Sequence, residues 1–234
     1  MTKQTILGFG RGRFVFVVGA MPLLIASGLL TAQPWHEILL ALYSVVTLMY
    51  LAEGRRAGAA CGIFFCLGHG ALFFTRGVWG LAVFNALFAA PVYLFSFIAW
   101  GRNIRRQEAG NRDQGVVDVK RLTIKGRALV LCVSAALFAG LFLLLRAVGS
   151  ANAPLDAFTL AVFAPALVLL RGRYLENWVL HFLGNAAAMS IWIINTVQDF
   201  MNFNFVLIGA VAVAVNVIGF VTWLKLGRKN GKIC

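Results

Sequence analysis

Eight apolar segments, each close to the length needed to cross a bilayer, dominate this sequence of 234 residues. They lie at about 14–33, 35–52, 57–75, 78–100, 127–149, 154–171, 176–194 and 204–224. A membrane-spanning helix needs roughly 20 mostly apolar residues. Only 12% of the residues are charged, against about 25% in soluble proteins. The sequence therefore predicts an all-α integral membrane protein with eight transmembrane helices.

The Lys and Arg residues occupy alternate connections between these segments. If the N-terminus is cytoplasmic, all of them except Arg76 and Arg146 fall on the cytoplasmic side. Cytoplasmic loops carry an excess of positive charge in membrane proteins, so we expect a multi-pass protein with both termini in the cytoplasm. The net charge of +13 then reflects orientation in a lipid bilayer and not binding to nucleic acid.

Two stretches of the chain resemble each other and indicate an internal repeat. Residues 65–71 (FCLGHGA) match residues 181–187 (HFLGNAA), and Trp100 and Trp223 each precede a basic segment. The predicted organisation is an additional helix at 1–34, a three-helix repeat at 35–100, a basic cytoplasmic loop and connector helix at 101–153, a second three-helix repeat at 154–226, and a basic tail at 227–234. One connector helix makes the repeats parallel, an architecture of transporters that bind substrate between the repeats.

Polar and aromatic side chains inside the apolar segments mark a candidate binding site, because polar groups in lipid are costly. At about 100° per residue, one face of the helix expected at 176–194 carries Trp178, His181, Asn185, Met189 and Trp192. The other candidates are Phe65, His69, Asn85, Phe88 and Asn216. They either line a substrate pocket between the repeats or tie helices together by hydrogen bonds. We favour the pocket for Asn185, and for His69 at the matching repeat position.

The sequence also restricts the chemistry. No Asp or Glu lies in the middle of an apolar segment, so no carboxylate that could couple transport to protons or sodium is visible. The four Cys and three His residues show no metal-ligand spacing, and no nucleotide-binding motif occurs. We therefore expect passive transport with no metal or cofactor. An uncharged aromatic pocket suits a flat organic cation.

Two other classes of protein are alternatives. A membrane-embedded enzyme needs a cluster of reactive groups near the interface, and Glu176 near His181 is the nearest approach to one. A non-transporting scaffold, or a substrate-binding subunit of a larger transporter, would be separated from a transporter by uptake into liposomes that contain this chain alone.

The segment Arg173-Tyr174-Leu175-Glu176-Asn177-Trp178, with Asn185 after it, resembles the PnuC family of bacterial vitamin transporters. The aromatic stretch from Tyr93 to Trp100-Gly101-Arg102-Asn103 agrees with this family, and the likeness covers about residues 35–228. The resemblance implies a SWEET-like fold of three plus one plus three helices in the bacterial inner membrane, and a homotrimer. It also implies uptake of nicotinamide riboside by facilitated diffusion, with trapping by phosphorylation in the cell. His181 stands where the riboside-type motif has a second Trp, so thiamine, riboflavin and nucleosides remain alternatives.

Overall fold

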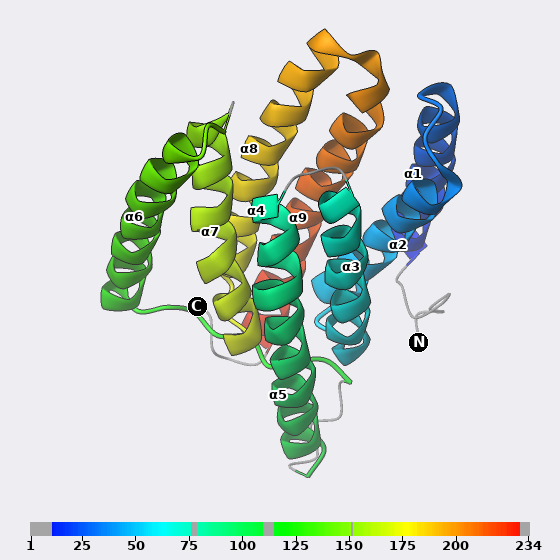
Figure 1. Ribbon diagram of the computed structural model, residues 1–234. Coiled ribbons are helices and arrows are strands. Elements are labelled where there is room, and N and C mark those ends of the chain that lie inside the picture. Colours follow the sequence, from blue (N-terminus) through cyan, green and yellow to red (C-terminus); the bar gives the residue numbers. More distant parts are fainter. Residues whose placement is uncertain (1–10, 76–78, 110–114, 151, 230–234) are drawn as a thin grey trace.

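The computed structural model describes residues 11–75, 79–109, 115–150 and 152–229, and Figure 1 shows them as a bundle of helices. The elements are α1 (Arg11–Leu30), α2 (Trp35–Ala52), α3 (Arg56–Thr75), α4 (Trp79–Val83), the π-helical turn η1 (Phe84–Ala89), α5 (Ala90–Ala109), α6 (Ile124–Ala147), α7 (Ala153–Gly172), α8 (Asn177–Gln198), the 3-10 turn η2 (Phe200–Asn202) and α9 (Phe203–Lys229). Because α4, η1 and α5 are continuous, eight helices in the described residues are long and apolar enough to cross a membrane. The prediction of eight transmembrane helices is confirmed.

Two local features differ from the expectation. The helix that was expected to end at Trp100 continues as α5 to Ala109, and Figure 1 shows it extending below its neighbours. This extension contains three Arg residues followed by Gln107, Glu108 and Ala109, and these residue types favour helix in water. The first part of the expected basic loop is therefore helical. The second feature is the π-helical turn η1, in which Asn85 Nδ2 donates to the carbonyl of Leu81 at 2.8 Å.

Lys3, Arg76 and the tail from 230 onward lie outside the described residues.

Apart from α1 and α6, the described helices form two groups of three. We call α2, α3 and α4–α5 the first triplet, and α7, α8 and α9 the second triplet. Within each triplet the middle helix contacts both others, and the triplets meet where α2 contacts α9 and where α5 contacts α7. Each seam thus joins the first helix of one triplet to the third helix of the other. The parallel repeat itself stays a prediction.

One end of the bundle holds the connections rich in Lys and Arg, and we call it the basic end. There, Arg13 near the start of α1 pairs with Glu53 after α2, and Gly54 lies beside Leu226 near the end of α9. The backbone N–H of Lys120, from the segment before α6, donates to the carbonyl of Arg173 after α7 at 2.8 Å. Burial lowers the pKa of the Arg173 guanidinium from its ordinary value.

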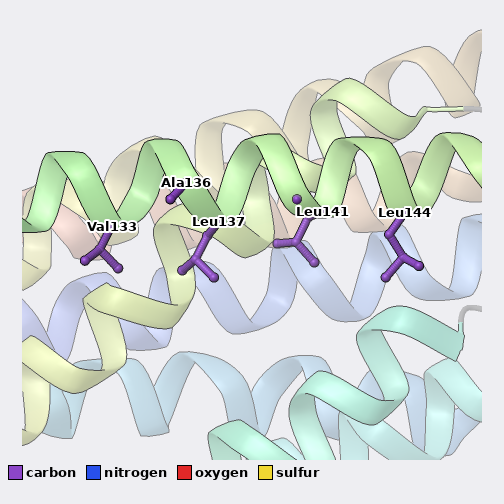
Figure 2. A pocket seen from close by; sticks show the side chains of 6 residues that line it. Val133, Ala136, Leu137, Leu141 and Leu144 are labelled. Carbon is purple, nitrogen blue, oxygen red and sulfur yellow. The ribbon is translucent and has the colours of Figure 1, made fainter.

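The connector α6 lies at the edge of the bundle, where α7 is its only neighbour among the described helices, and its Arg127 pairs with Glu176 before α8 at 3.0 Å. None of its residues is buried. Figure 2 shows one face of this helix, formed by Val133, Ala136, Leu137, Leu141 and Leu144, with Gly140 beside them. We call these residues the α6 face. A surface this apolar is stable only against lipid tails or another apolar protein surface.

Close packing of α3 against α2 depends on Gly58. A Cβ atom at this position would lie 2.5 Å from the backbone nitrogen of Leu51, and backbone cannot move aside as a side chain can. We therefore expect Gly58→Val to lower stability by about 1–3 kcal/mol, measured as a lower Tm of the purified protein in detergent. Gly19→Val is the control, because a Cβ atom there meets nothing within 4 Å. An equal effect of both substitutions would contradict this packing.

Candidate functional site

A cavity of about 210 Å³ lies between the two triplets, and every helix of both triplets contributes to its wall. The peripheral helices α1 and α6 contribute none of its lining. Its lining in the described residues contains aromatic, aliphatic and uncharged polar side chains, and no Asp, Glu, Lys or Arg. A cavity with few polar groups among apolar walls is the usual form of a small-molecule site.

Seven of the ten candidate residues line this cavity. They are Phe65 and His69 from α3, Asn85 from η1, and His181, Asn185, Met189 and Trp192 from α8. The structure thus brings together side chains from both triplets. His69 and Asn185, which occupy matching positions of the predicted repeat, both belong to the lining.

The two histidines have the same local geometry. Nδ1 of His69 lies 3.0 Å from the carbonyl oxygen of Phe65, and Nδ1 of His181 lies 2.9 Å from the carbonyl oxygen of Asn177. A carbonyl only accepts hydrogen bonds, so each Nδ1 must carry the proton and donate. In a neutral imidazole, Nε2 then keeps its lone pair. Each histidine therefore supplies an acceptor that can bind a hydroxyl group.

Asn185 and Thr159 supply further hydrogen-bonding groups to the cavity. The Asn185 side chain is half-buried and makes no hydrogen bond within the described part of the chain. The Thr159 hydroxyl, on α7, is buried and has no partner among the described residues. By contrast, Ser44 Oγ donates to the carbonyl of Leu40 at 2.7 Å. Unpaired polar groups in an apolar setting are costly, so a polar ligand at Asn185 and Thr159 would be stabilised.

Aromatic rings form much of the remaining wall. Phe65 and His69 lie with ring centroids 4.2 Å apart, and Phe163 lies 5.9 Å from His181. Toward the end of the bundle opposite the basic end, Trp192 stacks on Phe205 at 4.3 Å with an angle of 20° between the ring planes. These rings present π faces and edges to a ligand without any formal charge.

Three candidate residues do not line the cavity. Trp178 is 2% exposed and packs edge-on against Trp223, with ring centroids 5.6 Å apart. Asn216 is 1% exposed, and neither polar atom of its side chain has a partner among the described residues. Phe88 stacks on Phe84 at 5.3 Å, and it is Phe84 that reaches the cavity.

Sequence reasoning missed several lining residues, above all Tyr93 on α5, Thr159 and Phe163 on α7, and Phe205 on α9. Their helices are apolar around most of their circumference, so the pattern does not reveal which side faces inward. The sequence holds one indication for Tyr93. It lies seven residues before Trp100, and the candidate residue Asn216 lies seven residues before Trp223 in the other predicted repeat.

Comparisons with known proteins agree on one family. The family model described as nicotinamide mononucleotide transporter matches residues 34–225. The chain is 23% identical over 197 residues to a protein of Neisseria mucosa named nicotinamide riboside transporter PnuC, covering 84% of this chain and 74% of that protein. It is 21% identical over 205 residues to the protein of the same name from Haemophilus influenzae, covering 86% of this chain and 84% of that protein.

A solved structure agrees in fold. It is titled as the crystal structure of the vitamin B3 transporter PnuC, and it superposes with a TM-score of 0.81 at 20% identity, covering 96% of this chain and 95% of that one. The family model covers most of the chain and describes transporters, which sets the enzyme alternative aside. This chain is therefore a multi-pass membrane transporter that belongs to the nicotinamide mononucleotide transporter family, to which the PnuC resemblance pointed.

Proposed function

We propose that this chain carries nicotinamide riboside across the bacterial inner membrane by facilitated diffusion. The observation that carries the proposal is the cavity between the two triplets, which offers aromatic rings and uncharged hydrogen-bonding groups. Two relatives are named nicotinamide riboside transporters, and this substrate matches the cavity in its chemistry. It joins a flat cationic ring to a ribose with several hydroxyl groups.

Each part of this substrate has partners in the lining. The pyridinium ring would lie among Phe65, Phe163 and Trp192, because aromatic faces attract a cation even without an anion nearby. The ribose hydroxyls would donate to Nε2 of His69 and His181, whose Nδ1 atoms are already engaged with carbonyls. The Asn185 amide, unpaired within the described part of the chain, would bind the remaining polar substituents.

The lining favours the riboside over the mononucleotide of the family's description. A phosphate group needs Arg, Lys or a helix N-terminus as partner, and the described lining contains no cation. Burying a phosphate among the aromatic side chains without a counter-charge would be costly. Thiamine also has a cationic ring, so it is the alternative substrate that the same cavity would accept most readily.

The transport cycle that we propose is a rocking of one triplet against the other, which exposes the cavity to each side in turn. The basic end would face the cytoplasm with both termini, because positive charge accumulates there. Since the described lining carries no carboxylate, no coupling ion would be bound in it. Net uptake would then depend on trapping the riboside by phosphorylation in the cell.

We further propose a homotrimer, with the α6 face at or near the contact between copies. The support is that, among the described helices, α6 contacts α7 alone and that it exposes the apolar α6 face. Crosslinking of the protein in native membranes would test the oligomeric state. We expect a trimer band, and a monomer alone would contradict the assembly.

Uptake into proteoliposomes that contain only this chain tests the function. We expect labelled nicotinamide riboside to equilibrate without an ion gradient, and to accumulate only when a riboside kinase and ATP are enclosed. Excess unlabelled nicotinamide riboside should compete, whereas riboflavin should not. Stronger competition by thiamine would assign the thiamine alternative, and no uptake of any of these compounds would contradict a transporter that acts alone.

A further inference from the structure

Two tryptophans at the basic end make reciprocal hydrogen bonds across the seams between the triplets. The indole N–H of Trp100 on α5 donates to the carbonyl of Leu170 near the end of α7 at 3.3 Å. The indole N–H of Trp223 on α9 donates to the carbonyl of Leu51 near the end of α2 at 3.2 Å. Each bond joins the third helix of one triplet to the first helix of the other.

The two indoles also meet each other. Both are fully buried, and their ring centroids lie 5.9 Å apart. Trp178 packs edge-on against Trp223. We call Trp100, Trp178 and Trp223 the tryptophan cluster. It fills the basic end of the interface with bulky rings, and the triplets cannot separate there unless both cross-seam hydrogen bonds break.

One face of α9 leads from the cavity to this cluster. Ala212 lines the cavity, Asn216 follows one helical turn later, Gly219 packs against the ring of Trp178, and Trp223 comes last. Residues at these spacings share one side of a helix. The unpaired Asn216 amide and the Trp178 indole N–H, which also has no partner among the described residues, therefore lie between the cavity and the closed end.

The segment before α6 bonds to the ends of the first helix of each triplet at the basic end. The backbone N–H of Val117 donates to the carbonyl of Gly54 after α2 at 3.0 Å, and that of Lys120 donates to the carbonyl of Arg173 after α7 at 2.8 Å. Val117 and Val119 are fully buried in the same apolar core as Trp100 and Trp223. The basic end is thus closed in this conformation.

We propose that Trp100 and Trp223 form the gate at the basic end of the transport path. This inference rests on the proposed function in that it assumes a path through the cavity. Breaking the two indole hydrogen bonds lets the triplets part at this end. Asn216 and the Trp178 indole have no partner among the described residues while the gate is closed. They then face the opened path and supply hydrogen bonds to the departing substrate. This role explains why two polar groups outside the cavity lining are buried without a partner among the described residues.

Thiol labelling tests the gate without any substrate, so its outcome is independent of which compound is carried. Cys66 lines the cavity and becomes the only reactive site when Cys61, Cys132 and Cys234 are replaced by Ser. In this background we would measure the modification of Cys66 by a charged, membrane-impermeant methanethiosulfonate. Inside-out and right-side-out membrane vesicles would present the two ends of the protein separately.

Trp100→Phe and Trp223→Phe keep a ring but remove the N–H. Each should speed the labelling of Cys66 from the basic end by roughly fivefold, the effect of one lost hydrogen bond, and the double variant should react faster still. Trp35→Phe, at an exposed position on α2, should change nothing. A double variant that reacts at the original rate would overturn the gate. Equal acceleration from both sides would also overturn it, because the indoles would then hold the whole fold together and not one end.

Discussion

Asn185→Ala is expected to weaken nicotinamide riboside binding by at least about tenfold. The Asn185 amide lines the cavity and has no hydrogen-bond partner in the described part of the protein, so its capacity is free for the ligand. A site built to hydrogen-bond a substrate loses much affinity when one partner is removed, because the substrate's polar groups stay unpaired in an apolar setting. Isothermal titration of the purified protein would measure the change in Kd.

Ser190→Ala is the matched control for this prediction. Ser190 lies on the same helix, and its hydroxyl donates to the carbonyl of Ala186 one turn earlier at 3.0 Å. It is not part of the cavity lining, so affinity should stay within about twofold of the original value. Comparable losses in Asn185→Ala and Ser190→Ala would mean that α8 responds to any substitution, and the assignment of Asn185 would fail.

Val117→Asp should destabilise the closed basic end more than any other single change discussed above. The Val117 side chain is fully buried in the same apolar core as Trp100 and Trp223. An unpaired carboxylate in such surroundings costs about 3 kcal/mol or more. For a chain of this size that corresponds to a fall in Tm of roughly 10 °C, measured by thermal unfolding in detergent.

Val148→Asp makes the same chemical change at a position that is 71% exposed, after α6. It should leave Tm nearly unchanged. If the two Asp variants melt alike, the segment that contains Val117 does not seal the basic end.

The number of spans could be predicted from the sequence because each span depends on one local property, the length of an apolar run. The limits of α5 could not, because Trp100 and Gly101 look like a membrane boundary while helix propensity continues through Arg102 to Ala109. The π-helical turn η1 also escaped prediction, since its residues are ordinary helix formers and its geometry depends on packing.

Part of the candidate site could also be predicted from the sequence, and part could not. Helical periodicity placed His181, Asn185, Met189 and Trp192 on one face, and that face lines the cavity. Trp178 shares the face but lies one turn closer to the basic end, where Trp223 covers it. Helical periodicity predicts which residues share a face of the helix, but it does not predict how far along the helix the cavity extends. The contributions of α7 and α9, such as Thr159 and Phe205, depend on tertiary packing between triplets and left no periodic signal.

The central claim, that an uncharged aromatic cavity between the two triplets binds nicotinamide riboside, is tested most directly by titrating the purified protein with this compound and with nicotinamide mononucleotide. The compounds differ by one phosphate group, for which the described lining holds no cation. We predict that the riboside binds at least about tenfold more tightly, because the phosphate would be desolvated without a partner. Equal or tighter binding of the mononucleotide, or no binding of the riboside, would contradict the account.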